Sequence, residues 1–158
     1  MHRFALRLLR VVLAVLLLGT VLAQVLVPVF AADEGAIYPE VAQLVVPYSV
    51  AGILVIACVQ VALLMLWRLL SLVNAGVIFT RRALRWVDVI TACGAVATVL
   101  SAGVMIHLLF VIGVGGPGVI LGLAACLAGG LAFVLLMSVM RGLLETAIAD
   151  RTELDGVI

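Results

Sequence analysis

The hydrophobic residues of this chain fall into four long apolar stretches separated by short polar segments. The stretches cover residues 8–30, 44–67, 87–112 and 118–140, and none has a charged residue near its middle. A helix needs about 20 apolar residues to cross a hydrocarbon core of about 30 Å. Strands are excluded because the stretches do not alternate with period two and could not close a barrel. The pattern therefore predicts an all-α protein, a bundle of four transmembrane helices that forms a single membrane domain over residues 1–158.

The overall composition leads to the same class of protein. Of the 158 residues, 67% are hydrophobic and 11% are charged, whereas soluble domains have about 45–50% apolar and about 25% charged residues. A chain of this length could not hide so much apolar surface from water, so we expect the lipid bilayer to surround most of it. The net charge of +1 gives no reason to expect direct binding to nucleic acid.

The charged residues indicate which ends of the predicted spans share one side of the membrane. All nine basic residues are arginine, and they lie at the start of the first span, between the second and third spans, and after the fourth. The segment between the first two spans has only the acidic charges of Asp33, Glu34 and Glu40, and residues 113–117 have no charge. The positive-inside rule then predicts a multi-pass plasma-membrane protein with both termini in the cytoplasm.

The first 32 residues have an alternative interpretation as a cleavable signal peptide. A basic start precedes an apolar run, and Val29-Phe30-Ala31-Ala32 precedes Asp33 as a cleavage site would. The apolar run is longer than the usual 7–15 residues of a signal peptide. We therefore favour a first membrane span.

The cytoplasmic connection between the second and third spans is predicted to be ordered. Gly76 suits a helix C-cap after Asn74, and Thr80 suits the N-cap of the helix that enters the third span. Asp88 follows Arg85 by three residues, which is pairing distance on a helix. The basic residues that can meet anionic headgroups here are Arg68, Arg81, Arg82 and Arg85.

The residues after Arg141 predict a short amphipathic helix at the cytoplasmic C-terminus. Apolar residues recur near helical spacing from Leu144 to Ile158, with acidic residues mostly between them. Such a helix could pack on its own bundle, lie on the bilayer or dock a cytoplasmic protein. Its acidic residues argue against strong attraction to anionic lipid.

Small residues recur every four positions along the fourth span and form a ridge suited to close helix packing. The ridge consists of Gly118, Gly122, Cys126 and Gly130. The third span offers Gly94 and Thr98 as a counterpart, so spans three and four are predicted to pack closely. The alternative is that the ridge faces a second copy of the chain in a homo-oligomer.

Three strongly polar side chains lie deep within the predicted spans, namely Gln24, Gln60 and His107. At 1.5 Å per residue, Gln24 lies roughly 6 Å and His107 roughly 10 Å outward of their span centres, whereas Gln60 lies roughly 5 Å inward, level with Thr98. These depths predict hydrogen bonds from Gln24 to His107 and from Gln60 to the Thr98 region, each worth about 0.6–2 kcal/mol. His107 is also a candidate for a proton or ligand role, because ionisable groups inside a membrane are functional candidates by default, although a structural histidine is the simpler interpretation.

No pattern in the sequence indicates catalysis, a cofactor or a metal. The three cysteines, Cys58, Cys93 and Cys126, are expected at depths that differ by roughly 5–15 Å, whereas thiolate ligands lie about 2.3 Å from one zinc ion. The glycine-rich residues 113–118 lack the Lys-Ser/Thr ending of a phosphate loop. We therefore expect a protein that is not an enzyme.

Several short segments are similar to those of a known family. The most specific is Gly76-Val77-Ile78-Phe79-Thr80, and others are Tyr38-Pro39-Glu40-Val41-Ala42, Val46-Pro47-Tyr48 and Arg85-Trp86-Val87-Asp88. Over nearly its whole length the chain resembles the DUF2975 family of bacterial four-span membrane proteins, which has no established biochemical activity. Family members are often encoded beside a small helix-turn-helix regulator. The resemblance therefore implies a cytoplasmic regulatory partner, and it carries over no catalytic residues.

These observations lead us to expect an integral membrane protein that docks a cytoplasmic partner, with a transcription regulator as the candidate. The alternative is a small transporter or channel subunit that works as an oligomer. Transport needs a polar path through the membrane, for which one histidine and two glutamines are thin support.

Overall fold

The computed structural model describes residues 2–37, 39–74, 81–113 and 116–155. Four long helices follow one another along the chain, namely α1 (His2–Ile37), α2 (Val45–Asn74), α3 (Arg81–His107) and α4 (Pro117–Asp155). Two short helices flank them, the 3-10 helix η1 (Pro39–Leu44) and the π-helix η2 (Leu108–Ile112). The predicted all-α class is confirmed. Each predicted span lies inside one of four helical segments that are long and apolar enough to cross a membrane.

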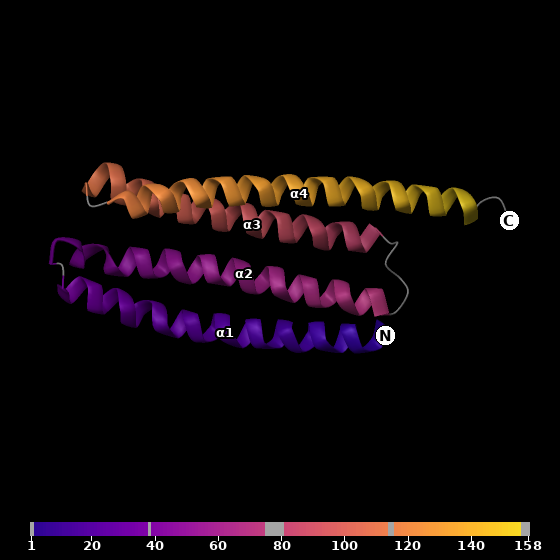
Figure 1. Cartoon of the computed structure of the whole chain (residues 1–158), viewed down its shortest axis with the longest axis horizontal. Helices are drawn as coiled ribbons and strands as arrows, with labels where there is room; N and C mark the ends of the chain where they lie inside the picture. The colour runs from indigo at the N-terminus through magenta and orange to yellow at the C-terminus, as the bar shows by residue number, and fades with distance from the viewer. Residues whose placement is uncertain (1, 38, 75–80, 114–115, 156–158) are drawn as a thin grey trace.

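The four long helices lie in chain order, and each packs against its neighbours in the sequence (Figure 1). Helices α2 and α3 lie between α1 and α4, and short connections make successive helices antiparallel. Because no helix is surrounded by the others, few described apolar side chains are buried; they are Leu13, Leu70, Ile90 and Ala102. Large apolar side chains cover the outside of the described helices instead. Such a surface requires lipid rather than water as its surroundings.

Five arginines with described side chains lie at the end of the bundle where α1 and α3 begin. We call this the arginine end, and its members are Arg7, Arg10, Arg68, Arg85 and Arg141. The opposite end, which contains Asp33 of α1, is the acidic end. Helix α2 is described as far as Asn74, and the predicted caps at Gly76 and Thr80 lie outside the described residues.

Helical structure continues past the predicted first span at the acidic end. The segment from Ala31 to Leu44 was predicted as a loop, but α1 runs to Ile37 and η1 follows it. Pro28 lies inside α1 without ending it, as membrane helices tolerate. The loop prediction was wrong because the length of an apolar run locates the hydrocarbon core, whereas a helix can continue through the headgroup region with its own backbone hydrogen bonds.

The turn into α4 begins with a change of helix type. Helix α3 ends at His107, η2 follows, and Gly113 has a φ of 69°, in the left-handed region. Glycine adopts this conformation without a Cβ penalty, so it ends the helix and turns the chain. Pro117 then occupies the first position of α4, where its missing N–H is not needed.

Helix α4 is the longest helix of the chain, with 39 residues. At 1.5 Å per residue it measures about 58 Å, almost twice the thickness of a hydrocarbon core of about 30 Å. The predicted amphipathic helix after Arg141 is therefore the continuous end of α4. Figure 1 shows this end extending past the arginine ends of the other three helices.

Candidate functional site

The interface between α3 and α4 is built on close approach at glycines. Gly130 lies directly against the Thr98 side chain, and Gly94 lies directly against the ring of Phe133. A Cβ atom added to either glycine would collide with these neighbours. The predicted close packing of spans three and four is confirmed, and van der Waals contact at small residues is the means that membrane helices commonly use.

Three of the four ridge residues of α4 take part in this interface. Besides Gly130, Gly122 lies against the thioether of Met105, and the Cys126 thiol lies 3.7 Å from a backbone carbonyl oxygen of α3. Gly118 has no neighbouring atom within 4 Å of the place where its Cβ would be. The packed ridge is therefore shorter than predicted, because α4 has only just left the turn at Gly118.

The interface between α1 and α2 contains a pair of amide side chains. Gln60 Nε2 donates to Gln24 Oε1 at 3.0 Å, and Gln24 Nε2 donates to the carbonyl oxygen of Ile53 at 3.4 Å. The predicted bonds from Gln24 to His107 and from Gln60 to the Thr98 region were wrong. Helix α1 packs on α2, and the Thr98 hydroxyl donates to a carbonyl oxygen of its own helix at 2.8 Å. Depth alone could not reveal which faces of the helices meet.

The side chain of His107 pairs with Tyr48, a partner that the predicted depths of the polar residues did not indicate. The Nδ1 atom of His107 lies 2.8 Å from the Tyr48 hydroxyl oxygen across the interface of α2 and α3. The two rings meet edge to face, with centroids 6.0 Å apart. Tyr48 lies near the start of span two and His107 near the end of span three. Since successive spans are antiparallel, these two positions share one end of the bundle, and this signal could have identified the pair.

Two apolar grooves flank the Tyr48–His107 pair. One has a volume of about 480 Å³ and is lined by both residues together with Gly103. The other has a volume of about 340 Å³ and is lined by Tyr48, Ser101 and Met105 among others. His107 therefore presents an ionisable ring to an apolar groove, which is the arrangement that makes an intramembrane histidine a functional candidate.

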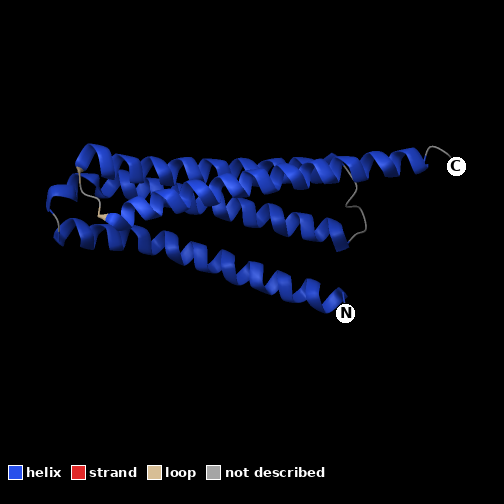
Figure 2. Cartoon of the chain, turned by 45° about the horizontal axis from the view of Figure 1, so that its top comes forward, coloured by secondary structure: helices blue, strands red, loops and turns tan. Residues whose placement is uncertain are grey.

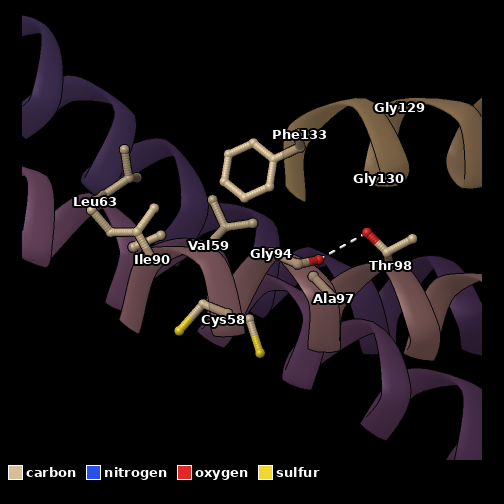
Figure 3. Close-up of a pocket in the computed structure, with 12 residues that line it drawn as sticks. Cys58, Val59, Leu63, Ile90, Gly94, Ala97, Thr98, Gly129, Gly130 and Phe133 are labelled. Atoms are coloured by element: carbon tan, nitrogen blue, oxygen red, sulfur yellow. Dashed lines mark hydrogen bonds between the residues drawn. The ribbon is translucent and has the colours of Figure 1, made fainter. Parts of the chain in front are cut away.

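A further cavity, of about 370 Å³, is lined by residues of α2, α3 and α4 (Figure 3). The ring of Phe133 from α4 points toward Val59 of α2, and apolar atoms make up most of the wall. Cys58 and Cys93 both line this cavity. Within the described part of the chain, no group of three His, Cys, Asp or Glu side chains could hold a metal ion.

The arginine ends of α3 and α4 are joined by ion pairs. Arg141 Nε lies 2.8 Å from Asp88 Oδ1, and Arg141 Nη2 lies 3.4 Å from Glu145 Oε1. Asp88 was predicted to pair with Arg85 on its own helix. It pairs with Arg141 instead, because the neighbouring helix brings a guanidinium group to the same level.

Of the four arginines predicted to meet headgroups, two have described side chains. Arg68 of α2 and Arg85 of α3 are exposed. Arg81 and Arg82 are the first residues of α3, and their side chains lie outside the described residues. Exposed guanidinium groups at the end of a membrane bundle suit contact with water and headgroups.

The fold and its polar pairs define a class of protein, a multi-pass integral membrane protein with four apolar helices. The family model described as "Protein of unknown function (DUF2975)" matches residues 29–158. The chain therefore belongs to the DUF2975 family, and the resemblance seen in the sequence is confirmed. No curated protein and no solved structure matches the chain.

Proposed function

We propose that this chain is a non-enzymatic plasma-membrane protein that docks a cytoplasmic partner protein on the end of α4, with a transcription regulator as the candidate partner. In this proposal the arginine end faces the cytoplasm, as the positive-inside rule favours. The observation that carries the proposal is the length of α4, whose last turns extend past the arginine ends of the other helices (Figure 1).

The extended end of α4 is attached to the bundle at its base. Arg141 joins α4 to α3 through Asp88, and it also contacts Glu145 one turn further along α4. The helix continues from this point without a break to Asp155. Because a continuous helix is stiff, the extension would offer its surface to a partner in a fixed direction, at a low entropic cost of binding.

The charge of the extension supports a protein partner over the bilayer surface. Residues 142–158 contain four acidic residues and one arginine, and anionic headgroups of the cytoplasmic leaflet would repel them. Apolar groups are also present, since Leu143 is 64% exposed. A basic surface with an apolar patch would complement this segment. Small DNA-binding regulators carry such basic surfaces, so docking here would compete with their binding to DNA.

Photo-crosslinking from the full-length chain in its own membranes tests this proposal. A photoreactive amino acid is placed at Thr146 or Ala149, both exposed on the extension, and at Leu135 as a control, which is exposed on the part of α4 expected within the membrane. We expect Thr146 and Ala149 to capture one soluble, basic protein that mass spectrometry identifies. Leu135 should capture only lipid.

An outcome in which all three positions capture only lipid or a second copy of the chain would overturn the proposal. Capture of the same protein from Leu135 would also count against it, because a lipid-facing position should not reach a soluble partner. Removal of residues 142–158 should abolish the captured complex while leaving the four spans in place.

A second candidate function, a transporter or channel subunit, is favoured by the Tyr48–His107 pair and its groove of about 480 Å³. The amide pair of α1 and α2 lies in a different interface, so several copies of the chain would have to complete a polar path. Proton flux into proteoliposomes tests this function. Flux that is present with the wild type and lost with His107→Phe supports it, and wild-type flux equal to that of empty vesicles contradicts it.

A further inference from the structure

Arg10 of α1 has a buried nitrogen atom without a hydrogen-bond partner. Its Nε atom is covered by surrounding atoms, and no acceptor among the described residues reaches it. A buried donor that is left unsatisfied costs about 1–3 kcal/mol, and more when the group is charged. Arg10 as a whole is half-buried, and its guanidinium group forms no ion pair with a described residue. The described part of the chain therefore supplies no counter-ion to this guanidinium group.

Arg10 lies on the face of α1 that packs on α2. Leu13, one turn further along, is 2% exposed, and Gln24 continues the same face at helical spacing. The hydrogen bond from Gln60 to Gln24 sets the antiparallel register of the two helices. This register brings Arg10 beside the last turns of α2, near the buried Leu70.

The sequence around this interface contains no acidic residue that could neutralise Arg10. Residues 1–32 and 41–87 contain no Asp or Glu. Asp33, the first acidic residue of α1, lies about 35 Å away along the helix at 1.5 Å per residue. Arg7, one turn before Arg10, is exposed and adds a second positive charge on the same side.

Two acidic residues with described side chains lie at the arginine ends of α3 and α4. Asp88 and Glu145 both contact Arg141. Helix α4 lies on the far side of the bundle from α1, and its extension points away from the bundle along its own axis (Figures 1 and 2). Among the described side chains, Arg10 at the α1–α2 interface therefore has no anionic partner.

We propose that the arginine end of the α1–α2 interface binds the phosphate group of an anionic phospholipid, with Arg10 as the main ligand residue and Arg7 as the second. Because its Nε is covered, Arg10 would bind the phosphate through parallel N–H···O bonds from its two terminal nitrogens, and basic pockets between membrane helices hold anionic headgroups. The aliphatic part of Arg10 packs between the helices while its charged end reaches the headgroup level. This site lies away from the extension of α4 and does not depend on the proposed docking function.

The side chains next to Arg10 favour a phospholipid over free phosphate. Leu9, Val11 and Val12 are all exposed and apolar, so they offer a surface for acyl chains that are attached to the same phosphate group. Free phosphate would gain nothing from these contacts. The phosphate group of a lipid also lies at the depth of Arg10, because Arg10 is near the start of the apolar stretch of α1, where the hydrocarbon core meets the headgroups.

Trp67 provides a reporter close to this site. The chain has two tryptophans, and Trp67 lies one turn before Leu70, on the face of α2 that also carries Gln60 toward α1. Trp86→Phe leaves Trp67 as the single fluorophore of the full-length chain. Quenching of Trp67 by brominated phosphatidylglycerol or brominated phosphatidylcholine, in vesicles that mix the two lipids, measures their relative affinity for the adjacent site.

We expect phosphatidylglycerol to be preferred over phosphatidylcholine by about fivefold for each arginine that contacts the phosphate. Arg10→Gln should remove most of this preference, and Arg10→Lys should retain part of it because the charge remains while the planar fork is lost. Arg68→Gln is the matched control. It removes an exposed arginine from the same end of the same helix pair, outside the face of α2 that meets α1, and it should preserve the preference.

Three outcomes would overturn the proposal. The first is equal quenching by the two lipids in the wild type. The second is an equal loss of preference in Arg10→Gln and Arg68→Gln, which would indicate a general surface-charge effect. The third is loss of the preference when inorganic phosphate is added to the buffer. Circular dichroism reports whether Arg10→Gln folds, and if it does not, the wild-type preference together with Arg10→Lys still decides.

Discussion

The α3–α4 interface and the α1–α2 interface hold two antiparallel helix pairs together by different combinations of close packing and polar contacts. Between α3 and α4, Gly94 and Gly130 let the two helices approach until side chains touch the opposite backbone. Between α1 and α2, the Gln24–Gln60 pair and the bond to a backbone carbonyl supply a polar link. Because lipid tails are as apolar as leucine, membrane helices gain little from hydrophobic burial and associate through close packing, polar contacts and lipid entropy.

The same two interfaces differ in how their arginine ends are neutralised. Arg141 is paired with Asp88 and Glu145 at the end of α3 and α4, whereas Arg10 has no acceptor for its buried Nε among the described residues. Arg141 of the α3–α4 pair has its counter-ions within the chain, whereas Arg10 of the α1–α2 pair has none among the described residues. The arginines that make up a positive-inside pattern therefore have two roles: some form ion pairs within the protein, and others are available to lipid headgroups.

The largest effect is expected from filling the closest contact of α3 and α4. Gly130→Val should lower the free energy of unfolding by about 1–3 kcal/mol, as overpacking does. The added side chain would collide with Thr98, which is β-branched and whose hydroxyl is held by a backbone carbonyl, so the helices must separate. Unfolding in mixed micelles measures the loss.

Gly129→Val is the control for this substitution. Gly129 is the adjacent residue on the same helix and has no atom within 4 Å of its Cβ position. The two variants change the helix propensity of α4 alike. Equal destabilisation by both would show that close packing of α3 and α4 is not what Gly130 contributes.

An intermediate effect is expected for the amide pair of α1 and α2. A double-mutant cycle with Gln24→Leu and Gln60→Leu should give a coupling energy of about 0.6–2 kcal/mol. Each single variant leaves one amide unpaired, whereas the double variant replaces both by apolar side chains. A coupling energy near zero would contradict the hydrogen bond as the link between these helices.

A smaller effect is expected where α2 meets α3. Tyr48→Phe removes the hydroxyl that bonds His107 and should cost about 0.6 kcal/mol, the average for polar pairs between membrane helices. His107→Phe in the Tyr48→Phe background should add little further loss of bonding. The matched comparison is Gln24→Leu combined with His107→Phe. These two changes should be additive, because the structure places the residues in separate interfaces.

The smallest effect is expected from the ion pair at the base of the α4 extension. Asp88→Asn should lower the free energy of unfolding by about 0.5 kcal/mol at low salt, because half-exposed ion pairs contribute little. The effect should shrink further at 1 M salt, where screening is stronger. A loss of several kcal/mol would mean that this end of the bundle is far more rigidly coupled than its exposure indicates.

Much of the fold could be predicted from the order of apolar and charged residues. The four spans, the close packing of α3 on α4 and the helical end after Arg141 all follow from local composition, because a bilayer admits only apolar segments with satisfied backbones. The pairing of polar side chains could not be predicted in the same way. Depth placed Gln24 beside His107, but the partners are Gln60 and Tyr48.

The sequence by itself determined that this chain crosses a membrane as four helices, since in hydrocarbon every backbone polar group must be bonded within its own segment. Only the tertiary structure decided which faces of these helices meet, because rotation about the helix axis and the antiparallel register depend on contacts between segments. That arrangement pairs Asp88 with Arg141 and leaves Arg10 facing α2 without an acidic partner among the described residues. The physical reason is that a helix presents several faces at every depth, and packing selects among them.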